Sequence, residues 1–161
     1  MQTFLPFEDF NLTARVLDRQ RLGKQRVECK QIFRALHNGG AWANHPAGRM
    51  WKGYSFTLLK YYYCIVEEWK RRGYKHEMML DPFVFQMAGT EPETPYWLGM
   101  YQLHSRHRAM LVYKYSQHYA RRFDLMGFEA NYIPVDVPGY FWPKPWSEVS
   151  ATIDPETIVP F

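Results

Sequence analysis

The sequence predicts a mainly α protein, a single compact helical domain with an extended C-terminal segment rich in proline and aromatic residues. The length of 161 residues fits one domain. Apolar residues recur at three- and four-residue steps through much of the chain before residue 125. Six of the 11 prolines follow residue 130, where they disfavour a long helix. We therefore expect one domain over 1–161, with a helical core over about 11–125 and an extended wrap over about 126–161.

The N-terminal third is predicted to hold an extended segment followed by two helices. Residues 1–7 alternate only weakly and include a proline, so we expect them to be extended or irregular. Asn11 suits the cap of a helix that begins at residue 12, because its side-chain oxygen can accept a bond from a free backbone amide. An apolar stripe then predicts a helix over about 21–36, which ends at Gly39-Gly40.

A second long helix is predicted over about 46–73, with Pro46 in its first turn and aromatic residues along one face. Residues 75–95 lack a sustained period and contain four glycines or prolines, which indicates a loop region. A further helical stretch is expected to begin at Thr94-Pro95 and to reach about Phe123, with a break near Gly99.

Several classes of protein are excluded. The longest apolar run, over 56–66, is shorter than a membrane span and contains Lys60. We expect no secretory signal, because the first ten residues carry two acidic groups and no basic one. Cys29 and Cys64 have no C-x-x-C spacing, so neither a disulfide framework nor a zinc site is expected. These features indicate a reduced, cytosolic protein.

Charge is distributed unevenly along the chain. Residues 15–34 carry seven basic groups against two acidic ones, and residues 101–125 carry five against one. Residues 129–161 have the opposite balance, with five acidic groups and one lysine. Basic segments interspersed with aromatic residues suit a nucleic acid, and Arg26 and Lys114 are among the expected DNA contacts. Solvated helix faces are the alternative explanation of such charges.

One helix edge brings together Arg21, Lys24, Glu28 and Gln31 at 100° per residue. Two interpretations of this edge are open. Lys24 and Glu28 can form an ion pair of a few tenths of a kcal/mol. Alternatively, a partly buried Glu28 acts as a general base in a basic groove that binds an anionic substrate.

The stretch over 103–123 carries a second group of polar residues. His104 and His107 have a spacing that could bind a metal, but no third ligand has a suitable position, so neither a metal nor another cofactor is expected. Arg108 and His107 are candidates for contact with phosphate or bases. In the alternative interpretation His104 and Ser105 form hydrogen bonds in the core and Arg108 pairs with an acid such as Glu28.

Aromatic residues near the C-terminus offer a second candidate for DNA contact. Tyr140, Trp142 and Trp146 surround two prolines in a stretch that is expected to be non-helical. Exposed, these rings would form a stacking platform for an extruded base; buried, they would form a packing lid. His45, before Pro46, either caps the following helix or lies in the groove.

Four motifs carry a resemblance to a known family. They are LDRQRLGKQRVE at residues 17–28, Asn44-His45-Pro46 with Met50-Trp51, HSRHR at 104–108 and YFWP at 140–143. Over about residues 1–145 the chain resembles an uncharacterised bacterial and phage family, which is grouped with pyrimidine-dimer DNA glycosylases of the phage endonuclease V type.

The resemblance implies a DNA glycosylase with strand-nicking lyase activity on duplex DNA that holds a damaged or modified base. In that family the terminal amine attacks the sugar and forms a Schiff base, assisted by a glutamate that matches Glu28. Arg21, Lys24 and Gln31 match positions that face the DNA. A terminal amine suits this role, because roughly a third of it is neutral at pH 7.5 against about 0.1% of an ordinary lysine.

The chain departs from the family pattern at residue 2. The characterised enzyme exposes a threonine after methionine removal, whereas Gln2 ordinarily leaves Met1 in place. The position of a family histidine is taken by Arg21. Three alternatives remain: Met1 presents the amine, Lys24 is the nucleophile with a pKa depressed by neighbouring cations, or the fold lacks this chemistry. Without it, the chain would be a non-catalytic DNA- or RNA-binding protein or a structural interaction domain. The oligomeric state is not predicted.

Overall fold

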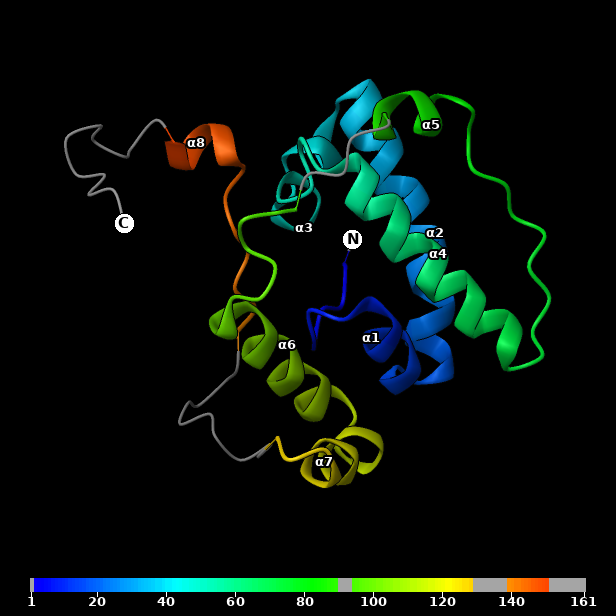
Figure 1. Cartoon of the computed structure of the whole chain (residues 1–161), viewed down its shortest axis with the longest axis vertical. Coiled ribbons are helices and arrows are strands. Elements are labelled where there is room, and N and C mark those ends of the chain that lie inside the picture. The colour runs from blue at the N-terminus through cyan, green and yellow to red at the C-terminus, as the bar shows by residue number, and fades with distance from the viewer. Residues whose placement is uncertain (1, 90–93, 129–138, 151–161) are drawn as a thin grey trace.

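The computed structural model describes residues 2–89, 94–128 and 139–150, and it confirms the predicted mainly helical class (Figure 1). These residues contain no strand. No helix in this part of the chain combines the length and apolarity that a membrane span requires. The helical elements are α1 (Phe10–Val16), α2 (Arg19–Asn38), η1 (Ala41–Asn44), α3 (Pro46–Arg49), α4 (Ser55–Arg71), α5 (Phe83–Ala88), α6 (Tyr101–Lys114), α7 (Ser116–Leu125) and α8 (Trp146–Ser150).

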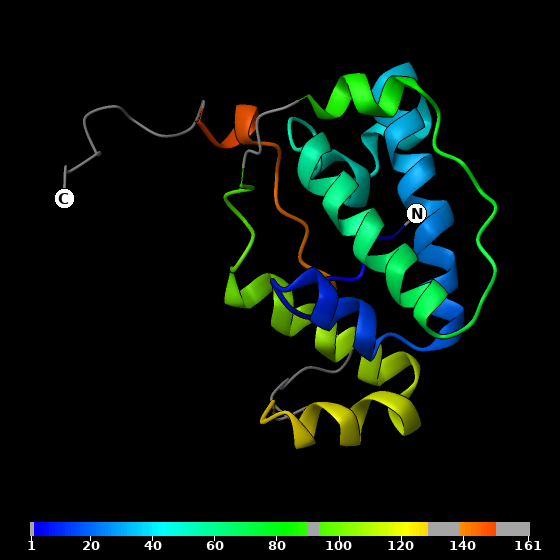
Figure 2. The same ribbon diagram turned by 45° about the vertical axis from the view of Figure 1, so that its right-hand side comes forward.

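Two long helices, α2 and α4, lie side by side and form one layer of the fold (Figures 1 and 2). Gly23 permits their close approach, because a Cβ at this position would lie only 3.0 Å from the Trp69 ring. The short helix α1 also packs against α4, while α6 and α7 contact each other. Segment 74–82 follows the outer side of the α2–α4 pair and is visible in both views.

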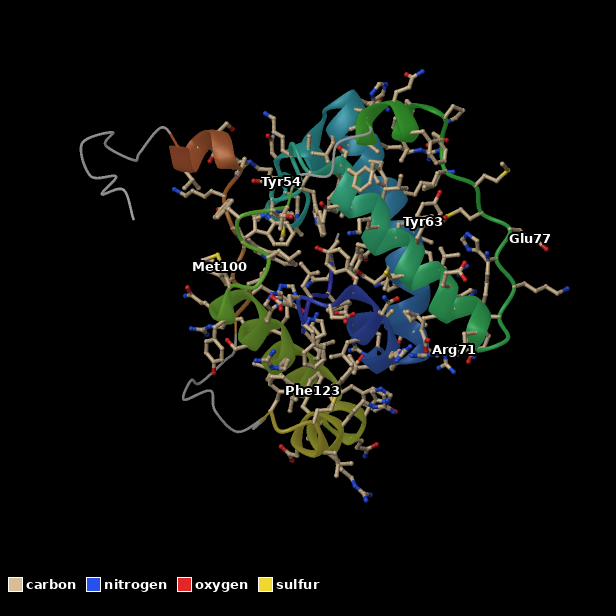
Figure 3. All side chains as sticks on the ribbon, viewed as in Figure 1. Tyr54, Tyr63, Arg71, Glu77, Met100 and Phe123 are labelled. Carbon is tan, nitrogen blue, oxygen red and sulfur yellow. The ribbon has the colours of Figure 1, made fainter. Side chains whose placement is uncertain are left out.

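The N-terminal segment runs through the middle of the molecule between these layers. Residues 3–7 are all buried. Because this extended segment has no neighbouring strand among the described residues, its buried backbone groups need side chains as hydrogen-bond partners. Tyr61 of α4 donates to the Phe4 carbonyl at 2.8 Å, and Thr13 of α1 donates to the Phe7 carbonyl at 3.1 Å. Apolar side chains fill the surrounding space, among them Phe123 of α7 (Figure 3).

Three predicted helix boundaries are wrong at their N-terminal ends. The first helix is capped by Asp9, whose side chain accepts from the Leu12 amide at 2.9 Å, and Asn11 is already inside it. The second helix begins at Arg19, two residues before the predicted start, because Asp18 caps it. Its predicted end at Gly39 is confirmed, since this glycine has φ 76°. The last long stretch begins at Tyr101 instead of at Thr94-Pro95.

Other predicted elements are divided or shortened. The single helix expected over about 46–73 is two helices, because a turn at 50–54 contains Gly53 with φ 86°. Tyr115, with φ −154°, separates α6 from α7 where continuous helix was expected. The expected loop region contains the short helix α5. Trp146, placed in a non-helical stretch by the prediction, begins α8. Much of the predicted C-terminal wrap, 129–138 and 151–161, lies outside the described residues.

Candidate active site

The site is built along one edge of α2, which the N-terminal cap positions. The Asp18 carboxylate accepts from the Arg21 amide at 3.1 Å and pairs with the Arg21 guanidinium at 2.7 Å. Tyr119 of α7 donates its hydroxyl to the same carboxylate at 2.5 Å. Hydrogen bonds from Tyr119 and Arg21 outweigh the effect of burial and lower the pKa of Asp18. The start of α2 is thereby tied to α7.

Gln25 joins this helix edge to the N-terminal segment. Its side chain is fully buried in α2, and its amide oxygen accepts from the Phe4 amide at 3.1 Å and from the Tyr61 hydroxyl at 2.7 Å. Its amide nitrogen donates to the Gln2 carbonyl at 3.1 Å and lies 3.4 Å from a Glu28 carboxylate oxygen. One side chain therefore holds residues 2–4 beside Glu28.

Glu28 is half-buried next to the beginning of the chain. Burial raises the pKa of the Glu28 carboxyl, while the positive charge of the amino terminus and that of Lys24 act in the opposite direction. A hydrogen bond from the Gln2 backbone also favours the ionised form. The terminal amine belongs to Met1, which lies outside the described residues.

The structure does not contain the Lys24–Glu28 ion pair that one interpretation of this edge predicted. Neither side chain has an oppositely charged side-chain atom within 4 Å among the described residues. Both side chains instead line an open cleft of about 250 Å³. Across it from α2 lies Lys114 of α6, whose pKa is lowered by partial burial and by the charges of Arg21 and Lys24. The complete lining is Gln2, Phe4, Gln20, Arg21, Lys24, Glu28 and Lys114. The cleft thus combines one carboxylate with three cations.

The first half of the chain carries a recognisable family pattern. A family model described as pyrimidine dimer DNA glycosylase matches residues 1–82. The chain belongs to this family. No curated protein and no solved structure matches the chain. The match includes the N-terminal segment, Gln25 and Glu28, and it ends before α6, which supplies Lys114 on the opposite wall of the cleft. The family identifies the protein as a DNA glycosylase in type, with DNA as its substrate.

Two histidines of this DNA glycosylase hold the N-terminal segment from the side of α6. His104 donates from Nδ1 to the Leu5 carbonyl at 2.8 Å, because its Nε2 accepts from the Gly99 amide at 3.0 Å. His107 accepts from the Leu5 amide at 3.0 Å through Nδ1. Burial lowers the pKa of His107 to about 3, so the ring is neutral. The core interpretation is confirmed for His104, whereas Ser105 bonds the Gln102 carbonyl at an exposed position.

Tyr140 and Trp142 lie over His107 as stacked rings. Their centroids are 5.1 Å apart, and each ring makes an edge contact with the imidazole. They thereby cover His107, which has no exposed surface. Lys114 lies 5.3 Å from the centre of the Tyr140 ring. Burial raises the pKa of Tyr140 to about 12, and the charges of Arg21 and Glu28 act on it in opposite directions. Because Lys114 lines the Glu28 cleft, the Tyr140 ring lies beside this cleft.

Two arginines that were predicted to contact DNA bind other parts of the protein and do not line the cleft. Arg26 faces the opposite edge of α2, where its guanidinium lies 4.0 Å from the centre of the Trp69 ring and bonds His76 at 3.0 Å. Arg108 donates to the Pro6 carbonyl at 2.6 Å and stacks on Phe128, so it holds the N-terminal segment and does not pair with Glu28.

Two further predicted residues lie beyond the cleft lining. Gln31 is exposed on α2, one turn past Glu28. His45 caps α3 through its ring nitrogen, which accepts from the Ala47 amide at 3.2 Å. Burial, followed by the positive charge of the amino terminus, lowers the pKa of His45.

Sequence reasoning missed the central residue of the site, Gln25. A signal for it exists, because Gln25 is a polar residue within the apolar stripe of α2, one turn before Cys29 and two turns before Ile32. A buried amide in such a position needs hydrogen-bond partners from outside its helix. The contacts of Gln20 with the cleft had no comparable signal, since exposed glutamines are common on helix surfaces.

Proposed function

We propose that this protein is a DNA glycosylase with AP lyase activity on damaged or modified bases, with the Met1 amine as nucleophile and Glu28 as its proton acceptor. The observation that carries the proposal is the clamp formed by Gln25, which places residues 2–4 and Glu28 on the same side of one cleft. A buried amide bonded to both the chain start and the carboxylate positions the two groups with little freedom.

The proposed chemistry begins when the neutral amine attacks C1′ of the nucleotide. A bond from the amine nitrogen to C1′ forms, the bond from C1′ to the base breaks, and the departing base takes a proton from water. Glu28 accepts a proton from the attacking nitrogen and returns it to O4′ as the sugar ring opens, which leaves a protonated Schiff base at C1′. A 2′ proton then passes to solvent, the C3′–O bond breaks with the phosphate as leaving group, and hydrolysis of the Schiff base by water releases the amine.

Glu28 suits the role of proton acceptor because opposing effects act on its pKa. Burial raises the pKa, which makes the carboxylate a stronger base, while the charges of the amino terminus and Lys24 keep it ionised near neutral pH. The positive charge of Lys24 also favours the neutral form of the amine, since a neighbouring like charge disfavours its protonation. Lys24, which is exposed beside Glu28, is the alternative nucleophile.

The remaining cleft residues have binding roles in this proposal. Arg21, Lys24 and Lys114 neutralise the phosphates next to the reacting sugar. Tyr140 and Trp142 form an apolar wall for an extruded base, and Gln31 and His45 extend the contact surface along α2. His107 and Arg108 act through the N-terminal segment that they hold, as positioning residues.

Trapping with borohydride tests the proposal. Duplex DNA that contains an abasic site or a pyrimidine dimer is incubated with the protein and reduced, and a covalent adduct is expected. Glu28→Gln should slow its formation by about 10²- to 10⁴-fold, because it removes one general base. Glu67→Gln is the matched control on an exposed position of α4. Absence of an adduct with every lesion, or equal rates for the two variants, contradicts the proposal.

A further inference from the structure

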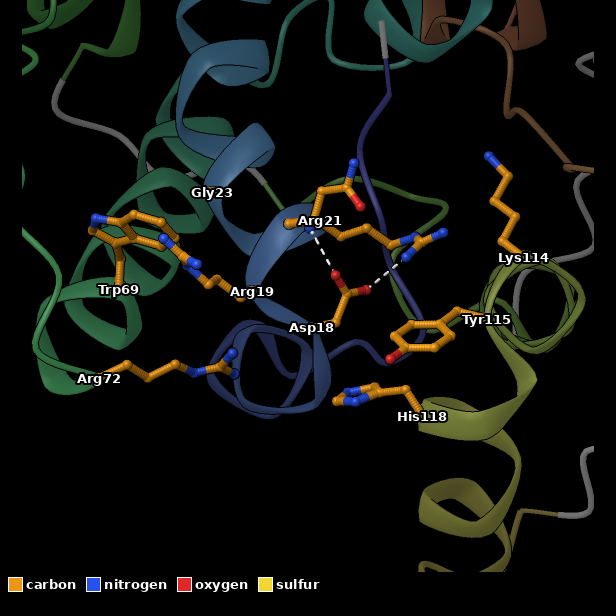
Figure 4. Close-up of a pocket in the computed structure, with 10 residues that line it drawn as sticks. Asp18, Arg19, Arg21, Gly23, Trp69, Arg72, Lys114, Tyr115 and His118 are labelled. Carbon is orange, nitrogen blue, oxygen red and sulfur yellow. Dashed lines mark hydrogen bonds and ion pairs between the residues drawn. The ribbon is translucent and has the colours of Figure 1, made fainter.

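A second, larger cleft adjoins the Glu28 cleft. It has a volume of about 870 Å³ and lies between the start of α2, the end of α4 and the junction of α6 and α7 (Figure 4). We call it the flanking trough. Gln20, Arg21 and Lys114 line both clefts, so the trough continues the path that begins at Glu28. Its volume is within the range of small-molecule sites, about 300–1,000 Å³.

One wall of the trough is held rigidly by Arg72. This side chain pairs with Glu68 at 2.7 Å and donates to the carbonyls of Leu17, Ala14 and Arg15 at 2.8 to 3.2 Å. At the bottom, the Asp18 carboxylate is occupied by Arg21 and Tyr119. The shape of the trough therefore exists without a ligand, and its acidic group is already neutralised.

Two cations of the trough have no acidic partner. Arg19 on α2 and Lys114 on α6 form no ion pair with any carboxylate of the described residues. Both are exposed. The Arg19 guanidinium lies 5.1 Å from the centre of the Tyr74 ring and extends toward Trp69, whereas Lys114 comes from the other wall (Figure 4). Lys114, which borders the trough beside Tyr115, is therefore the cation that an anion next to this ring would meet. A phosphate of a nucleic-acid backbone has the charge and the donor preference that such a position requires.

An aromatic face accompanies these cations. Tyr115 is 44% exposed and stacks on His118 with ring centres 5.7 Å apart and planes 17° apart. His118 is fixed in turn by a hydrogen bond to the Val16 carbonyl at 3.0 Å. The break between α6 and α7 occurs at Tyr115 itself, whose ring borders the trough beside Lys114. A supported ring with an exposed face is a surface on which any base can stack.

We infer that the flanking trough binds a nucleotide next to the reacting one, with its phosphate on Lys114 and its base stacked on Tyr115. This inference rests on the proposed function. Because the trough extends from the Glu28 cleft toward the start of α2, it receives the strand on one side of the reacting nucleotide.

A binding experiment with an unreactive substrate tests the inference. The probe is a duplex that contains a tetrahydrofuran abasic analogue, with 2-aminopurine on either side of it, and fluorescence reports both affinity and stacking. Tyr115→Ala should weaken binding by about 5- to 100-fold, the range of one base–aromatic stack. Tyr113→Ala is the matched control, because Tyr113 is an exposed tyrosine of α6 outside the trough. Equal affinities of the two variants overturn the inference.

Two further experiments show on which side of the reacting nucleotide the DNA strand enters the trough. Shortening the duplex on one side of the analogue should remove the difference between wild type and Tyr115→Ala, whereas shortening the other side should preserve it. Lys114→Ala should reduce the slope of log affinity against log salt by about 1, and Arg122→Ala on α7 should leave it unchanged. A difference that survives both truncations overturns the inference. Because the analogue cannot react, failure of the lyase chemistry would leave these results unaffected, and the two proposals fail separately.

Discussion

Replacement of Gln25 by leucine removes the clamp between α2 and the N-terminal segment while keeping a side chain of similar size. The Phe4 amide then stays buried without its partner, which costs about 1–3 kcal/mol. Loss of the bond to the Gln2 carbonyl adds about 1 kcal/mol. A total of about 2–4 kcal/mol lowers the melting temperature of a chain of this size by roughly 5–15 °C. The fold should survive at 20 °C.

Borohydride trapping at 20 °C then separates positioning from stability. Gln25→Leu should form the covalent adduct at least about 100-fold more slowly, because a displacement of about 1 Å at a reacting group has an effect of this size. Tyr61→Phe is the matched control: it loses two hydrogen bonds of the same network but leaves the bonds from Gln25 to residues 2 and 4 intact. Its adduct should form at nearly the wild-type rate. Equal rates for both variants would refute the positioning argument.

Two further predictions concern stability and DNA affinity. The pKa of His107 is about 3 in the folded state against 6.5 in the unfolded chain. The contribution of the neutral ring to the free energy of unfolding is therefore complete above pH 6.5 and declines as the pH falls toward 3. Urea unfolding should show a loss of about 2 kcal/mol between pH 8 and pH 5, and His107→Gln should flatten this profile; a wild type equally stable at both values would contradict the buried neutral ring. Lys24→Ala should reduce the salt dependence of DNA binding by about one unit of slope, whereas Arg26→Ala should leave the slope unchanged and lower the melting temperature by a few degrees. Equal slopes for these two variants would contradict the assignment of the two residues to different edges of α2.

The fold class follows from periodicity, and so does the helix edge that carries Glu28. Lys24, Glu28 and Arg21 share an edge in any regular helix, and the apolar stripe decides which side of that helix is buried. The boundaries fail where a local side chain competes with the pattern. Asp9 caps the first helix two residues before Asn11, Asp18 caps the second before its periodic stretch begins, and Gly53 lies in a turn where the aromatic spacing alone would continue a helix.

The opposite side of the site depends on contacts between distant parts of the chain. Lys114 faces Lys24 across 90 residues of sequence, and Leu5 bonds His107 across 102 residues. No local pattern states that His107 is committed to the backbone of Leu5, because a histidine next to arginines has the same sequence context in a binding groove. Arg26 shows the same ambiguity, since its contacts with His76 and Trp69 come from segments 74–82 and α4.

The central claim is that the chain start and Glu28 form one reactive site. Its most direct test is peptide mass mapping of the protein trapped by borohydride on DNA with an abasic site. The account predicts that the DNA remnant is attached to the amine of Met1, in a peptide that also contains Gln2. Attachment to a lysine, at Lys24 or at any other position, would contradict it.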